Sequence, residues 1–120
     1  MTYILVLTSV VAMTGAQLFL KKGLLQVGGF PDSVSKIGDF FLSAYSNVYV
    51  LLAVLLTAVT ALAWTAAVSK AELSHVYPFM ALSYVLVALF SLVLFKEDVT
   101  ALRWAGVVVI CVGVFLVSRS

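Results

Sequence analysis

Four long stretches of the chain lack charged side chains, and short polar segments separate them. The stretches run from Thr2 to Leu20, from Phe40 to Ser69, from Val76 to Phe95 and, apart from Arg103 near its start, from Val99 to Ser118. A bilayer core of about 30 Å needs about 20 apolar residues in an α-helix, which each stretch can supply. The pattern predicts four membrane-spanning helices over residues 3–23, 47–69, 75–95 and 100–118.

A membrane barrel and a secretory signal fit these stretches less well. Strands of a membrane barrel alternate apolar and polar residues over about 10 positions, whereas these stretches are continuously apolar. A secretory signal is the alternative for the first stretch, but no positive residue precedes it and its charges, Lys21 and Lys22, follow it. We expect an all-α membrane protein in which residues 1–120 form one four-helix domain.

The segment between Gly23 and Asn47 is the one connection long enough to hold a further element. It opens with the turn signals Gly28-Gly29 and Pro31-Asp32. Apolar residues then recur at spacings of three and four, at Val34, Ile37, Phe41 and Tyr45. This spacing is typical of a short amphipathic helix lying in the membrane interface, and an ordinary loop is the alternative.

The composition and charge of the chain also favour a membrane protein over a water-soluble, nucleic-acid-binding or enzymatic one. Of the 120 residues, 64% are hydrophobic and 10% are charged, which does not suit a water-soluble surface. A net charge of +2, with no basic cluster longer than two residues, argues against a nucleic-acid partner. The lone His75 and Cys111 have no ligands at metal spacing and no phosphate-binding loop is present, so we expect no metal, no cofactor and no enzymatic activity.

The basic residues also predict an orientation. Lys21, Lys22, Lys36, Lys96 and Arg103 fall on one side of the four predicted helices, and Lys70 and Arg119 fall on the other. The positive-inside tendency then places both termini outside. Insertion in either direction is the alternative if Lys21 or Lys22 lies within the bundle for functional reasons.

Polar residues within the spans are the candidates for a binding site, because each needs a partner or a water-filled cavity. Two stripes have the spacing i, i+3, i+7, and they consist of Thr14, Gln17 and Lys21 and of Thr57, Thr60 and Trp64. A third stripe, with the spacing i, i+7, i+14, consists of Tyr77, Tyr84 and Ser91. We hypothesise that they converge on one hydrated site. The alternatives are hydroxyls bonded to their own backbone, aromatic residues at the membrane interface and a lysine that extends to the headgroups.

The last helix carries small residues instead. Gly106 and Gly113 lie seven residues apart and share a face with Ile110 and Val117. Small residues on one face allow two helices to approach closely. We interpret this face as a dimer interface, with packing inside one chain as the alternative.

The third predicted helix and its flanking residues contain LSHVYP at 73–78, ALSYVLVAL at 81–89 and FKE at 95–97. These motifs resemble the third-helix signature of the drug/metabolite transporter superfamily, which includes small four-helix membrane proteins. Its fourth helix resembles Trp104-Ala105-Gly106 with Ile110, Gly113 and Val114, and its first resembles residues 15–17 with 20–23. The resemblance covers nearly the whole chain except residues 28–46.

Two groups within the superfamily offer different functions. In the small multidrug resistance exporters a first-helix glutamate exchanges protons for cationic drugs, and its position corresponds here to Thr14, which does not titrate near neutral pH. Tyr77-Pro78 and Leu82-Ser83 are more similar to flippase subunits that move undecaprenyl-phosphate-linked monosaccharides across the bacterial inner membrane. The resemblance therefore implies a lipid flippase that works as a homodimer or with a similar small subunit.

On this interpretation Thr14, Gln17, Trp64, Tyr77 and Tyr84 form the substrate site and Lys21 attracts the lipid phosphate. The partners are then a lipid-linked sugar or another small molecule, membrane lipids and a second subunit. An exporter of small cations or metabolites, and an accessory membrane subunit that transports nothing, are the alternatives.

Overall fold

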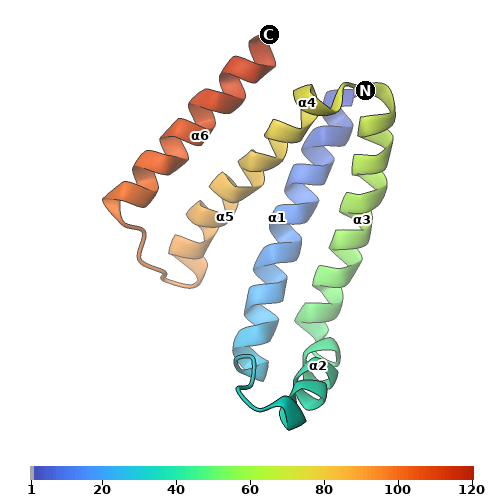
Figure 1. The fold of residues 1–120 in the computed structure, drawn as a ribbon, viewed down its shortest axis with the longest axis vertical. Helices are drawn as coiled ribbons and strands as arrows, with labels where there is room; N and C mark the ends of the chain where they lie inside the picture. The colour runs from blue at the N-terminus through green and yellow to red at the C-terminus, as the bar shows by residue number, and fades with distance from the viewer. Residues whose placement is uncertain (1) are drawn as a thin grey trace.

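The computed structural model describes residues 2–120, so Met1 of the predicted domain lies outside the described residues. Four spans in it are long and apolar enough to cross a membrane, which confirms the predicted fold class. The first is α1 (Thr2–Val27), the second is α3 (Val48–Lys70), and the fourth is α6 (Ala101–Arg119). The third span combines α4 (Leu73–Val76), η2 (Tyr77–Met80) and α5 (Ala81–Leu94). The spans lie side by side in the order α3, α1, α5, α6 (Figure 1).

The first helix is one turn longer than the predicted range of 3–23, because Gly23 does not end it. A Cβ atom at Gly23 would lie 2.6 Å from Val50 Cγ2 and 3.0 Å from the Val50 backbone nitrogen. The glycine thus allows α1 and α3 to pack closely rather than breaking the helix. The helix ends at Val27, where Gly28 adopts a φ of +108° and its N–H donates to the Leu24 carbonyl at 2.8 Å.

The amphipathic pattern after that turn does form a helix. A 3₁₀ turn, η1 (Val34–Lys36), leads into α2 (Ile37–Tyr45). Phe30, Phe40 and Phe41 pack edge to face, with ring centroids between 5.2 and 6.1 Å apart. Asn47 then caps α3, because its side-chain oxygen accepts the Tyr49 N–H at 2.9 Å, and its amide donates to Gln26 Oε1 at 3.0 Å. The membrane-interface location of α2 stays a prediction.

The third span begins at Leu73, two residues before the predicted start. Pro78 consequently lies inside the span, where it lacks the N–H that would continue the α-helical ladder. The backbone there adopts the tighter 3₁₀ geometry of η2 before α5 continues to Leu94.

The last helix lies at the edge of the bundle and contacts α5 (Figure 1). Thr100 caps it by accepting the Arg103 N–H at 3.1 Å. Its buried residues are Val107 and Val114, and most other side chains are exposed. Val114 joins the main buried cluster, which also contains Val6, Val10, Ala67, Val76 and Phe79.

The close contact at Gly23 yields a first prediction. Gly23→Ala should lower the free energy of unfolding in detergent by about 1–3 kcal/mol, the usual cost of overpacking, because the new methyl group meets Val50. Gly38→Ala, in α2, is the matched control because no heavy atom lies within 4 Å of its added Cβ. Thermal unfolding followed by circular dichroism measures both, and equal midpoints would contradict the close α1–α3 contact.

Candidate functional site

Two aromatic side chains define the candidate site near the start of the third span. Trp64 on α3 and Tyr77 on η2 meet edge to face, with ring centroids 5.8 Å apart and planes inclined at 72°. They border a cavity of about 310 Å³ between α1, α3 and η2. Its lining consists of Met13, Thr57, Thr60, Ala61, Trp64, Tyr77 and Met80. The volume is at the lower end of the range of about 300–1,000 Å³ that is usual for small-molecule sites.

The polar groups of the cavity have unused hydrogen-bonding capacity. Thr57 Oγ1 donates to the Ala53 carbonyl at 2.8 Å, and Thr60 Oγ1 donates to the Leu56 carbonyl at 2.9 Å. Each hydroxyl keeps lone pairs that accept a ligand's donor. No hydrogen bond within residues 2–120 uses the Tyr77 hydroxyl or the Trp64 indole N–H, and the Tyr77 side chain is 62% exposed. The cavity thus offers acceptors, donors and ring surfaces together.

The structure brings some of the predicted site residues together and separates others. Gln17 lies one turn from Met13, and its Nε2 is 3.5 Å from Met13 Sδ, so it is next to the cavity without lining it. Tyr84 faces a different cavity, of about 300 Å³, with Ser91, Glu97 and Arg103. Lys21 lines a third one, of about 350 Å³, with Phe30 and Phe40.

Thr14 occupies the contact between α1 and α5 and does not line the aromatic cavity. It is 4% exposed, and its hydroxyl lies 2.8 Å from the Val10 carbonyl and 3.2 Å from Ser83 Oγ. A pair of neutral hydroxyls therefore links the two helices near the middle of α1.

Sequence reasoning missed several cavity residues. Met13 and Met80 gave no signal because an apolar side chain in an apolar span is indistinguishable from packing. Thr57 and Thr60 belonged to a recognised stripe but were not assigned to the site.

Lys22 was not assigned to a binding site either, although its Nζ lies 4.6 Å from the centroid of the Tyr49 ring. Within residues 2–120 no group of three His, Cys, Asp or Glu side chains is close enough to hold a metal ion.

The glycine face of α6 is open in the monomer. An added Cβ at Gly106 or Gly113 would meet no heavy atom within 4 Å, whereas Ile110 packs partly against the core. Val117 on the same face is half-buried.

A family comparison bears on what these four helices do. The model of the EamA-like transporter family matches residues 1–119. The chain belongs to this family. This EamA-like protein is therefore a multi-pass membrane transporter.

Its curated relatives include flippase subunits. It is 34% identical over 121 residues to "Probable 4-amino-4-deoxy-L-arabinose-phosphoundecaprenol flippase subunit ArnF" of Photorhabdus laumondii, covering 98% of this chain and 96% of the relative. The protein of the same name from Serratia proteamaculans is 30% identical, with 93% and 88% of the two chains covered. The ArnE subunit of Pseudomonas savastanoi is 30% identical over 79 residues, which are 66% of this chain and 69% of the relative. No solved structure matches this EamA-like protein.

The hydroxyl pair between α1 and α5 can be tested by a double-mutant cycle. Thr14→Val and Ser83→Ala should each lower the free energy of unfolding, because each change removes the partner of one buried hydroxyl. The double variant should lower it by less than the sum of the two single changes. We expect a coupling of about 0.6 kcal/mol, which is typical of hydrogen bonds between membrane helices. Reversible unfolding in mixed micelles measures it, and strictly additive losses would show that the two hydroxyls do not interact.

Proposed function

We propose that this protein is one subunit of a dimeric flippase that moves a polyprenyl-phosphate-linked monosaccharide across the inner membrane. The observation that carries the proposal is the aromatic cavity, which Trp64 and Tyr77 line together with Thr57 and Thr60. The lipid chain remains in the bilayer, so the protein needs to shelter only a polar headgroup during its passage.

The chemistry of the cavity fits a small sugar. Sugar hydroxyls donate to the free lone pairs of the threonines and accept from Tyr77 and Trp64. The ring surfaces pack against the sugar's C–H faces, and they also attract an ammonium group by about 0.5–2 kcal/mol. The relatives' name specifies an amino sugar, 4-amino-4-deoxy-L-arabinose, on a phosphoundecaprenol carrier. An amino sugar of this kind is the headgroup that we propose for the cavity.

The neutral contact at Thr14 supports a flippase over a proton-coupled exporter. Proton exchange needs a group that titrates near neutral pH, and threonine and serine hydroxyls do not. The cavity lining likewise contains no carboxylate. Both observations favour a substrate held by hydrogen bonds and ring contacts.

The proposal includes a second subunit, because one chain leaves the cavity open. Tyr77 is 62% exposed on the rim, so the cavity needs a further wall before it can shield a headgroup from lipid. The open face of Gly106 and Gly113 is the surface that we propose for pairing, either with a second copy or with a similar small chain. The names of these relatives also describe each of them as a subunit.

The proposed headgroup site predicts a loss of transport on aromatic substitution. Trp64→Leu should reduce the flux of lipid-linked amino sugar in liposomes by about tenfold, because it removes a ring worth about 1–2 kcal/mol to a cationic headgroup. Flux is read from the accessibility of the sugar amine to a membrane-impermeant reagent. Thr57→Val should lower flux by about two- to tenfold through the lost hydroxyl.

Each variant has a matched control outside the cavity. Trp104→Leu removes the chain's second tryptophan, which is on α6, and Thr65→Val removes a hydroxyl that bonds to the Ala61 carbonyl in the same way as that of Thr57 bonds to Ala53. Both controls should transport like the natural chain. Wild-type liposomes that show no flux above empty ones, with any candidate partner subunit co-reconstituted, would refute the proposed function.

Pairing through α6 is tested separately. Gly106→Leu combined with Gly113→Leu should raise the dissociation constant of the dimer at least tenfold, since overpacking a helix contact costs about 1–3 kcal/mol. Val108→Phe adds bulk on the opposite side of α6 and should leave association unchanged. Fluorescence energy transfer between labelled subunits at varied protein-to-lipid ratios reports both. If the glycine variants associate normally, α6 is not the pairing helix.

A further inference from the structure

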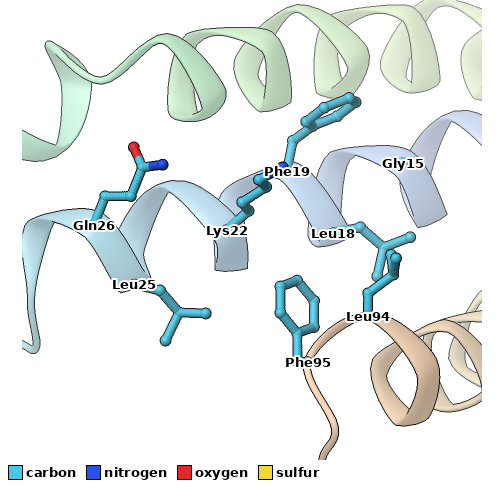
Figure 2. Close-up of a pocket in the computed structure, with 8 residues that line it drawn as sticks. All are labelled: Gly15, Leu18, Phe19, Lys22, Leu25, Gln26, Leu94 and Phe95. Carbon is cyan, nitrogen blue, oxygen red and sulfur yellow. The ribbon is translucent and has the colours of Figure 1, made fainter.

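A groove runs along the side of α1 that is opposite to the aromatic cavity. Its volume is about 510 Å³, and it lies where the end of α5 diverges from α1. Figure 2 shows Leu94 and Phe95, from the end of α5, facing Leu18 and Leu25 across it. The two helices are in contact at Thr14 and Ser83. They diverge from that contact toward the C-terminal ends of both helices, because their axes cross at an angle (Figure 1).

The groove changes from apolar to polar along α1. Along α1, its deeper part is lined by Gly15, Leu18 and Phe19, and its outer part by Lys22, Leu25 and Gln26, so both polar side chains lie in the outer part. Gln26 lies one residue before the end of the helix at Val27. At a rise of 1.5 Å per residue, residues 15 to 26 span about 16 Å. This order, with apolar residues toward the bilayer centre and polar residues toward the helix end, is the order of chain and headgroup in a membrane lipid.

The polar end of the groove has donors available. The Lys22 ammonium is 4.6 Å from the Tyr49 ring centroid, and no hydrogen bond within the described part of the chain uses it. Gln26 accepts from Asn47 through Oε1, which leaves its Nε2 donors for another partner. An ammonium and an amide N–H₂ together suit a phosphate group.

The groove is separate from the proposed headgroup site. Met13 lines the aromatic cavity and Lys22 lines the groove. Nine residues at 3.6 per turn make two and a half turns, so the two side chains project from opposite faces of α1. A molecule in the groove therefore does not occupy the cavity.

We propose that this groove is a binding site for an anionic phospholipid of the surrounding bilayer, with Lys22 contacting the phosphate and Leu18, Leu25, Leu94 and Phe95 packing against an acyl chain. Charge complementarity supports this occupant, because Lys22 supplies the groove's single formal charge and no carboxylate lines it. Basic pockets between membrane helices commonly bind anionic headgroups on the cytoplasmic side. The distribution of lysine and arginine predicts that this end of α1 faces the cytoplasm.

The site is tested by native mass spectrometry of the purified full-length protein in a mixture of phosphatidylglycerol and phosphatidylethanolamine. The natural chain should bind more phosphatidylglycerol than phosphatidylethanolamine. Lys22→Gln should lower phosphatidylglycerol affinity about fivefold, the effect expected for one basic residue at a membrane surface. Lys22→Arg should retain the preference, and so should Lys36→Gln, which removes an exposed lysine of η1 that does not line the groove.

A second variant separates the groove from the charge alone. Leu94→Trp fills the apolar part without changing any charge, so it should reduce the binding of both lipids. The proposal is refuted if Lys22→Gln retains the natural preference, or if Leu94→Trp binds both lipids normally. It is also refuted if polyprenyl phosphate at equal concentration displaces phosphatidylglycerol, because the groove would then belong to the carrier lipid. None of these outcomes depends on whether the protein transports a sugar.

Discussion

A polar group inside a bilayer needs a partner within the protein, because lipid tails supply none. The threonines of this chain meet that need locally: Thr57, Thr60 and Thr65 each donate to a backbone carbonyl of their own helix. A donor satisfied in this way leaves the oxygen's lone pairs free. At Thr57 such an oxygen lines a cavity, so it can accept a hydrogen bond from a ligand. When no ligand is bound, the hydroxyl proton is still paired with the backbone carbonyl.

The same constraint makes α1 the organising element. It packs closely on α3 through Gly23 and reaches α5 through Thr14 and Ser83, so it lies between two neighbours (Figure 1). A helix with neighbours on two sides leaves two open faces. One face contributes Met13 to the aromatic cavity and the other contributes Lys22 to the groove. The adjacent Lys21 and Lys22 consequently line different cavities. Their neighbouring positions in the sequence do not indicate this difference.

The spans could be predicted from the sequence because charges are excluded from about 20 consecutive residues by the bilayer alone. The ends of the helices depend on tertiary contacts and were less predictable. Gly23 resembles a helix end when the sequence is considered alone, and only its distance from Val50 identifies it as a packing residue. Pro78 fits either the start of a helix or a kink within one when the sequence is considered alone. The extension of the span to Leu73 decided this, since it places the proline within the span.

Helical spacing predicted the part of the candidate site that lies on α3. Thr57, Thr60 and Trp64 all lie within one uninterrupted helix, α3, and they line one cavity as their spacing predicts. Tyr77 and Tyr84 are seven residues apart but border different cavities. The segment between them includes η2, and a 3₁₀ helix turns by about 120° per residue instead of about 100°, so the phase of the stripe shifts after Pro78. Tyr84 also lies about 10 Å further along the span than Tyr77, at about 1.5 Å per residue, so Tyr77 is the tyrosine that meets Trp64.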